Sequence, residues 1–417
     1  MTLFLFLRRC IKLIKHKDKL VITSIAAGYN LIYNLYVMKA LYYSTMIEGL
    51  HLTHYQLGRI YSMYGILAMF SYLCGAFFLK KFQSKKLIYI PLMITSFVSL
   101  FLASLPSYTL ILLMFGIAGF TVGATFYPAY LSILHNTGNP ENQGKVFSTF
   151  FFMNSIFGSI FSIIGFKIIS LMNNSESQIR FLFLFYGILT FISAIFSIIT
   201  LKDIKDTEKD EGKKFDKKQI MAVVKNKNIF LTIIVVFANY VAVANFTYIL
   251  PYLSYNFNLP DYVLNTISVV RMYLIIIIAA PIAGSITDKL QSSAKLMRIS
   301  FILYIATIFI MVFIFPRNPI MTIICSIMIC FFAYGGKSMA LITIDETGIS
   351  RKLYGVAISY ISFVAYSPDV FYFSLSGWIL DNCKTYGYSI VFVMSAVISL
   401  IGLIASSLLI KRKYKSQ

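Results

Sequence analysis

The sequence predicts an all-α membrane protein, with twelve transmembrane helices in two pseudo-symmetric six-helix bundles. Hydrophobic residues make up 58% of the 417 residues and charged residues 13%, so a soluble globular domain is excluded. The mean hydropathy is +0.77. Long apolar runs recur throughout the chain, and roughly 20 apolar residues are enough for a helix to cross a bilayer. One long polar stretch separates two halves of similar length.

The apolar runs and the polar segments between them set the boundaries of the expected spans. We expect these spans at residues 20–45, 55–79, 87–105, 108–134, 146–172, 181–201, 228–256, 262–288, 297–316, 319–344, 353–380 and 388–410.

The polar stretch at 202–227 is rich in lysine and acidic residues and predicts a solvated, flexible cytoplasmic linker. It divides the chain into an N-terminal bundle, 20–201, and a C-terminal bundle, 228–410. Residues 1–19 place an apolar run before a set of cations, which is typical of an amphipathic segment on a membrane surface. Residues 411–417 form a basic cytoplasmic tail.

The positive charges predict the orientation. Of the 37 lysines and arginines, 29 lie in segments on one side of the expected membrane and only 3 on the other. This asymmetry places both termini in the cytoplasm, in a cell (inner) membrane. The net charge of +21 is therefore a property of loops and tails, and we expect no nucleic-acid partner.

The sequence contains no pattern typical of an enzyme, a metal site or a cofactor site. The five cysteines include no C-x-x-C pair, and no histidine falls in the middle of an expected span. No phosphate-binding G-x-x-x-x-G-K-S/T loop and no pairing of a nucleophile with a base is present. We therefore expect no metal, no cofactor and no enzymatic activity.

The two halves repeat each other at matching loops. The segment 75–84, beginning at Gly75, aligns with 283–292, and both follow the second span of their half. Parallel repeats of this kind are one known plan of membrane transporters. With its twelve spans and its charged central loop, the chain resembles the major facilitator superfamily. The signature of that family in these loops is partly matched by Gly284, Asp288 and Lys289, whereas Lys80 replaces the acid in the first copy.

The resemblance implies that Gly284, Asp288, Lys289 and Gly75 belong to a motif that locks one conformation of the transporter. A narrower similarity, to the organophosphate:phosphate antiporter branch and its bacterial relatives, rests on Gly28-Tyr29 with Tyr33 and on Leu57-Gly58 with Ser62. That branch carries an arginine where this chain has Tyr36, so its phosphate-ester specificity does not carry over.

Ionisable side chains within spans are candidates for function, because a charge in hydrocarbon is costly unless it faces water or a partner. Arg271 lies near the middle of its span and offers a planar fork suited to carboxylate or phosphate. Its alternative role is pairing with an acid or with helix carbonyls. Lys39 and Arg59 either contact an anion or extend to the outer headgroups. Lys337 follows two glycines and needs a partner of its own.

Asp369 is the acid expected in the middle of the membrane. It is either a proton-coupling site or a fixed counter-ion of Lys337 or Arg271. Polar side chains also mark the first and seventh spans, which line the cavity in the family that the chain resembles. Tyr29, Tyr33 and Asn34 lie on the first span, and Asn239 and Tyr240 lie on the seventh.

The predicted function is secondary active transport by alternating access in a monomer. The excess of cations over acids within the spans favours a small organic anion or a phosphorylated metabolite, coupled to a counter-anion or to a proton. Two alternatives remain: a transporter of a neutral solute such as a sugar or nucleoside, and a transporter-like membrane sensor.

Overall fold

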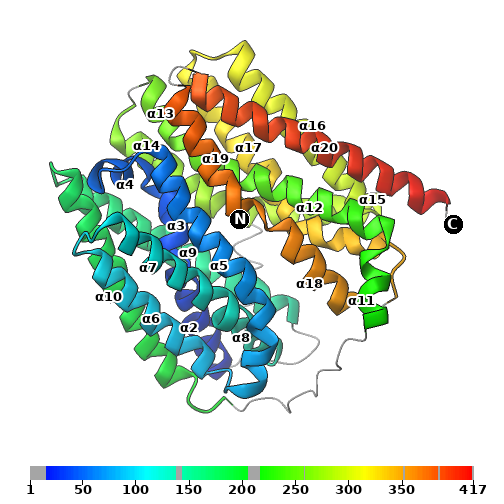
Figure 1. The fold of residues 1–417 in the computed structure, drawn as a ribbon, viewed down its shortest axis with the longest axis horizontal. Helices are drawn as coiled ribbons and strands as arrows, with labels where there is room; N and C mark the ends of the chain where they lie inside the picture. The colour runs from blue at the N-terminus through cyan, green and yellow to red at the C-terminus, as the bar shows by residue number, and fades with distance from the viewer. Residues whose placement is uncertain are drawn as a thin grey trace. The chain divides into compact units, whose positions relative to one another are not determined.

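The computed structural model describes residues 16–137, 143–204, 217–257, 259–350, 353–383 and 386–415, and its secondary structure in this part of the chain is helical (Figure 1). The chain divides into two compact units. The first contains Met1–Leu52 and Arg59–Gly212, and the second contains Thr53–Gly58 and Lys213–Gln417.

The first unit is built around α10 and α6, which lie side by side, as do α2 and α9. Its elements are α2 (His16–Ile32), α3 (Asn34–Leu41), α4 (Tyr43–Gly49), α5 (His54–Lys81, of which the first turn groups with the second unit), α6 (Lys86–Leu102), α7 (Tyr108–Thr121), η1 (Val122–Phe126), α8 (Tyr127–His135), α9 (Gln143–Ile169) and α10 (Ser175–Thr200).

The second unit is built around α12 and α20, with α16 against α20 on the other side (Figure 1). Its elements are α11 (Lys217–Val224), α12 (Lys227–Asn245), η3 (Phe246–Tyr248), α13 (Ile249–Phe257), α14 (Asp261–Val269), η4 (Val270–Leu274), α15 (Ile275–Leu290), α16 (Ser293–Phe309), η5 (Ile310–Ile314), α17 (Pro319–Ala340), η6 (Leu341–Glu346), α18 (Tyr354–Ala365), α19 (Pro368–Asn382) and α20 (Gly387–Lys415).

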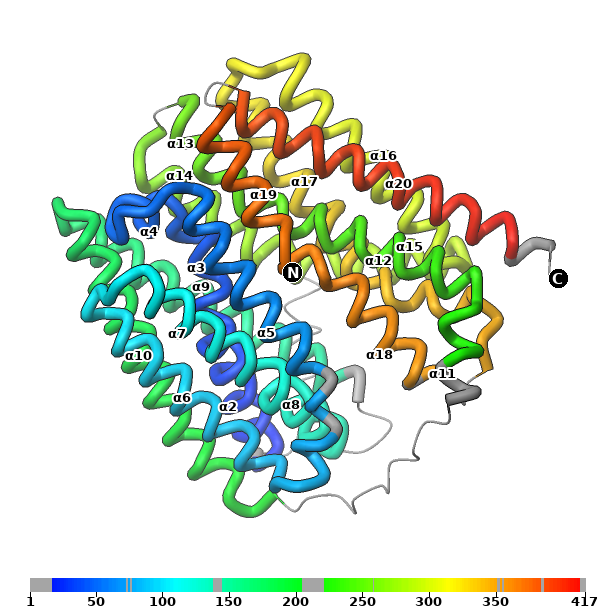
Figure 2. The backbone as a smooth tube through the Cα atoms, viewed as in Figure 1, coloured from blue at the N-terminus to red at the C-terminus, as the bar shows by residue number. Residues whose placement is uncertain are grey.

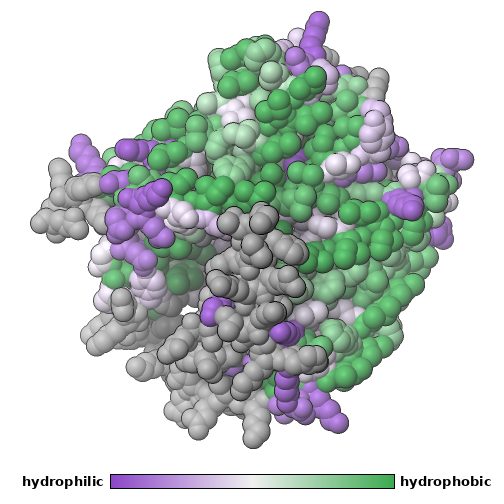
Figure 3. Space-filling model, turned by 180° about the vertical axis from the view of Figure 1, so that it is seen from behind, coloured by the Kyte–Doolittle hydropathy of each residue, from purple (hydrophilic) through white to green (hydrophobic). Residues whose placement is uncertain are grey.

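Each expected span falls on a helix or on consecutive helices of the described chain. Nine helices there are long and apolar enough to cross a membrane, or ten if the bent pair α2–α3 counts as one span. The two other expected spans fall on α5, which is long, and on α6, which is apolar but short at 17 residues. Figure 3 shows hydrophobic side chains over most of the coloured surface, as lipid contact requires.

Polar residues precede several of these helices; α12 and α17 start within one residue of the expected spans, whereas α10 and α16 start several residues earlier. Asn174, Asn226, Ser292 and Asn318 each accept a hydrogen bond from a backbone N–H of the first turn that follows. Such caps satisfy amide groups that have no partner within the helix. Asn174 and Asn318 are exposed, whereas Ser292 is buried and its hydroxyl also donates to Glu346.

Part of the predicted linker, 202–227, is helical in the described residues. Helix α11, Lys217–Val224, forms within it because Val223 is fully buried and α11 packs against α18. Residues 205–216 lie outside the described residues, as does the predicted amphipathic segment up to residue 15. Helix α20 continues past the last expected span, to Lys415.

Several spans are interrupted near their middle. The first span bends by 59° between α2 and α3 at Tyr33 (Figure 2). The seventh passes through the 3-10 turn η3, and the eighth passes through the π-helical turn η4. In a membrane, such irregular backbone is tolerated where protein or a water-filled cavity surrounds it, and π-turns are frequent at functional sites. The interruptions therefore indicate the parts of the spans in which functional side chains are expected.

Glycines in α7 and η1, which are Gly116, Gly119 and Gly123, allow close approach to α5. A Cβ atom on Gly119 would meet the backbone carbonyl of Tyr64. A backbone atom cannot move aside as a side chain can, so this contact depends on glycine.

We expect Gly119→Val to lower the melting temperature of the purified protein by several degrees, since overpacking typically costs about 1–3 kcal/mol. The matched control is Gly284→Val, because the nearest atom to a Cβ there is Met339 Cε at 3.8 Å. Equal melting temperatures for the two variants would contradict the close packing of α7 on α5.

Candidate functional site

Arg271 is the most deeply buried cation in the described part of the second unit, with 1% of its surface exposed. It lies on the π-helical turn η4. Its Nη2 donates a hydrogen bond to the Phe246 carbonyl at 2.6 Å, and its Nε donates to Cys330 Sγ at 3.4 Å. The Phe246 ring centroid lies 5.9 Å from Arg271 Cζ. The side chain is thus held by three contacts, one with a carbonyl, one with a thiol and one with an aromatic ring.

One nitrogen of this guanidinium is left without a hydrogen bond. Arg271 Nη1 is buried and has no partner among the described residues, and no acidic residue there forms a salt bridge with Arg271. A buried charge without a counter-ion is costly, and an unsatisfied buried donor adds to that cost. The prediction that Arg271 pairs with helix carbonyls is therefore met in part, and an N–H group remains to receive an acceptor.

The helix break η3 provides the carbonyl that holds Arg271. Phe246 O accepts the backbone N–H of Ile249 within the 3-10 turn and, in addition, Arg271 Nη2. The preceding residue, Asn245, is fixed by a buried network: its Nδ2 donates to Tyr304 Oη at 3.1 Å, and Tyr372 Oη donates to its Oδ1 at 3.0 Å. This network holds the start of the break in one position.

The polar face of α12 continues toward the helix start through the two residues that the sequence singled out. Asn239 Nδ2 donates to the Ala333 carbonyl of α17 at 3.2 Å. Tyr240 Oη donates to Asp369 Oδ2 at 2.6 Å, and its ring lies 4.8 Å from that of Tyr366. Asn239 therefore contacts α17, the helix that carries Cys330, and Tyr240 contacts the candidate residue Asp369.

Asp369 begins α19 and is 9% exposed. Its carboxylate acts electrostatically on the ammonium group of Lys337. Lys337 itself is exposed, and it lies two turns along α17 from Cys330, the residue that contacts Arg271. In this unit, Asp369 is thus associated with Tyr240 and Lys337, whereas Arg271 is held by neutral groups.

The first unit gathers aromatic side chains around the bend at Tyr33. The Tyr29 ring lies 4.6 Å from Tyr33, 5.1 Å from Tyr130 and 5.3 Å from Phe150, as measured between ring centroids. Asn34 is buried, and its Nδ2 has no partner within the described part of the chain. The predicted residues Tyr29, Tyr33 and Asn34 therefore lie at a helix break.

Lys39 and Arg59 have different environments, although the same two alternatives are predicted for both. Lys39 is 3% exposed, with its Nζ 3.2 Å from the centroid of Tyr36 and 4.5 Å from that of Tyr61. Arg59 is exposed. Burial against aromatic rings excludes an extended position of Lys39 at the headgroups, while Arg59 retains that alternative.

The predicted conformational-lock residues lie near helix ends or in helix contacts. A Cβ on Gly75 would meet Pro128 Cγ at 3.2 Å, so this glycine packs against α8. Gly284 has more space around it. Asp288 and Lys289 are exposed in the last turn of α15.

Sequence reasoning did not assign functional roles to several residues of these sites. Phe246, Cys330, Tyr334, Tyr61 and Tyr130 all contact the predicted residues or their neighbours. Apolar or aromatic residues within an apolar span carry no local signal of function, and only their contacts reveal a role. Within the described residues, no group of three His, Cys, Asp or Glu residues is placed to hold a metal ion.

Comparisons with known proteins agree with this architecture. A model of the Major Facilitator Superfamily matches residues 20–371. The Inner membrane protein YihN of Escherichia coli (strain K12) is 26% identical over 390 residues, covering 91% of this chain and 92% of that protein. The Uncharacterized protein MG294 homolog of Mycoplasma pneumoniae is 22% identical, covering 90% and 89%.

Solved structures share the fold at low identity. The nucleoside transporter NupG aligns with a TM-score of 0.71 at 14% identity, covering 95% of this chain and all of that one (100%). A bacterial homolog of the human lysosomal transporter Spinster, inward-facing and unoccupied, aligns with a TM-score of 0.73 at 12% identity, covering 95% and 98%. The chain belongs to the Major Facilitator Superfamily and is an integral membrane secondary transporter, not an enzyme.

Proposed function

We propose that this transporter moves a small organic anion or a phosphorylated metabolite, and that Arg271 contacts the anionic group. The observation that carries the proposal is the buried Nη1 of Arg271, which has no hydrogen-bond partner among the described residues. A carboxylate or phosphate oxygen would satisfy that donor and compensate the buried charge in one contact.

The distribution of charge in the second unit supports an anion over a cation. Asp369 is engaged by Tyr240 and acts on Lys337, so it is not the counter-ion of Arg271. A cationic substrate would add a second uncompensated positive charge near the guanidinium. An anion would instead compensate the charge of the guanidinium itself. The same reasoning favours anion exchange. An empty site leaves the charge of Arg271 uncompensated, so a second anion must bind when the first one leaves.

The first unit supplies further substrate contacts in this proposal. Tyr29, Tyr33 and Asn34 offer hydroxyl and amide groups next to an aromatic surface. Lys39 adds a positive charge that the Tyr36 and Tyr61 rings partly compensate. Arg59 acts as an outer anion contact. The aromatic groups orient the carbon skeleton of the substrate, and the cations select its charge.

The remaining features of the proposed transport cycle are those that the resemblance to the family implies. The protein works by alternating access as a monomer, with the bundles 20–201 and 228–410 as its moving parts and both termini in the cytoplasm. Gly75, Gly284, Asp288 and Lys289 act as the conformational lock, with Lys80 in place of the acid in the first copy.

The second candidate is transport of a neutral solute such as a nucleoside or sugar. The aromatic rings around Tyr29 favour it, since such rings bind the flat faces of bases and sugars. The structural neighbour NupG is a nucleoside transporter, but at 14% identity its likeness indicates the fold alone.

Arg271→Gln tests the anion site. In a thermal-shift panel of organic acids, phosphate esters, sugars and nucleosides, we expect one anion class to stabilise the wild type. The variant should bind that anion roughly 10- to 100-fold more weakly, because a charge-assisted hydrogen bond contributes about 1.5–3 kcal/mol. Arg271→Lys should bind the anion with intermediate affinity, since it keeps the positive charge but loses the planar guanidinium group.

The control is Arg298→Gln, an exposed arginine of α16, which should bind the anion like the wild type. Melting temperatures without ligand separate a folding defect from a binding defect. Stabilisation by neutral solutes alone, or equal anion affinity in Arg271→Gln and the wild type, would refute the anion proposal.

A double-mutant cycle tests whether Asp369 is a fixed counter-ion. We expect Asp369→Asn and Lys337→Gln to be individually destabilising, and the double variant to lose less stability than the sum. Because Lys337 is exposed, a coupling of about 0.2–1 kcal/mol is expected. Tyr240→Phe, which removes only the hydroxyl, should cost about 1 kcal/mol.

Additive effects would reject the pairing of Asp369 with Lys337. Asp369 would then be available as the proton-coupling group, and transport in proteoliposomes should respond to a pH gradient in the wild type and lose that response in Asp369→Asn.

A further inference from the structure

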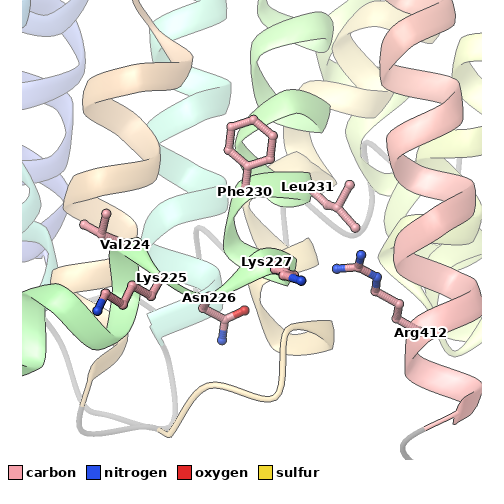
Figure 4. Close-up of a pocket in the computed structure, with 7 residues that line it drawn as sticks. All are labelled: Val224, Lys225, Asn226, Lys227, Phe230, Leu231 and Arg412. Atoms are coloured by element: carbon pink, nitrogen blue, oxygen red, sulfur yellow. The ribbon is translucent and has the colours of Figure 1, made fainter.

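A second basic site lies at the other end of α12 from the helix break. A cavity of about 370 Å³ opens where α11, α12 and α20 come together (Figure 4). The residues that line it are Val224, Lys225, Asn226, Lys227, Phe230, Leu231 and Arg412. These residues contribute three cations and no carboxylate, so the cavity is suited to an anion.

The two cations on facing helices define the mouth of this cavity. In Figure 4 the side chains of Lys227, from α12, and Arg412, from α20, extend toward one another across it. Arg412 Nη1 also donates to Asn228 Oδ1 at 3.3 Å, which holds the guanidinium beside α12. Lys225 extends from the end of α11 in another direction. Both Lys227 and Arg412 are exposed and accessible to a ligand.

Two backbone N–H groups at the start of α12 already have a hydrogen-bond acceptor. Asn226 Oδ1 accepts the backbone N–H groups of Asn228 at 2.8 Å and of Ile229 at 3.2 Å. Recognition of an anion at this site therefore falls to the lysine and arginine side chains and not to free amides of α12.

The ligand must be amphipathic, because the cations border an apolar surface. Phe230 lines the same cavity and is 59% exposed, one turn further along the membrane-spanning helix α12. On α11, Met221 and Val224 are also exposed. A soluble anion gains nothing from these side chains, whereas a lipid places its headgroup at the cations and its acyl chain along Phe230.

The site lies on the side that the lysine excess assigns to the cytoplasm. Anionic lipids of that leaflet attract basic segments next to a membrane, and basic pockets between transmembrane helices bind their headgroups. We propose that the cavity between α11, α12 and α20 binds the phosphate of an anionic phospholipid of the cytoplasmic leaflet. This inference does not depend on the transported substrate.

Binding of individual lipids by the full-length protein in detergent tests the proposal, with native mass spectrometry as the readout. Phosphatidylglycerol should bind more tightly than phosphatidylcholine with the same acyl chains. Lys227→Gln/Arg412→Gln should weaken phosphatidylglycerol binding about 30-fold, because each cation near a membrane surface contributes roughly a factor of five. Phe230→Ser should also weaken it.

The matched control is Lys86→Gln/Arg298→Gln, which removes two exposed cations that do not line the cavity. It should bind like the wild type, as should the charge-preserving Lys227→Arg/Arg412→Lys. Equal binding of both phospholipids would overturn the proposal, as would equal losses in the two double glutamine variants. Binding of glycerol phosphate as tight as that of the lipid would show that a soluble phosphate is the ligand instead.

Discussion

The hydrogen bond from Arg271 Nη2 to the Phe246 carbonyl is the interaction on which the candidate site depends. It joins two interrupted helices, since Arg271 lies on the π-turn η4 and Phe246 begins the 3-10 turn η3. A guanidinium without an acidic partner is costly to bury, and this contact with a backbone dipole offsets part of that cost. It also fixes the direction of the remaining N–H group, so the site is organised before any ligand arrives.

The ionisable groups of the second unit have different partners. Asp369 is held by Tyr240 and is associated with Lys337, which leaves Arg271 with neutral contacts. If Arg271 had been paired with Asp369, the site would be neutral and suited to an uncharged solute. The partner that each ionisable group has therefore bears on the substrate class that we propose.

The positive charges of the chain serve at least two roles that composition cannot separate. Most of them lie in the expected loops, where they predict the orientation of the protein in the membrane. Lys227 and Arg412 are part of that excess, yet they are far apart in the sequence and converge on one cavity that Phe230 and Leu231 also line. A lipid site of this kind would couple the second unit to the composition of the surrounding leaflet.

The sequence by itself determined the helical membrane class, the positions of the spans and the candidate residues Arg271, Asp369, Asn239 and Tyr240, because a charge or amide in an apolar run is conspicuous and costly. Only the tertiary structure decided their partners. It placed Cys330 and Phe246 around Arg271, buried Lys39 against tyrosines and formed α11 inside the polar stretch. Hydropathy is a local property that a sequence displays directly, whereas contacts join residues far apart in the chain, and their geometry arises only when the helices pack.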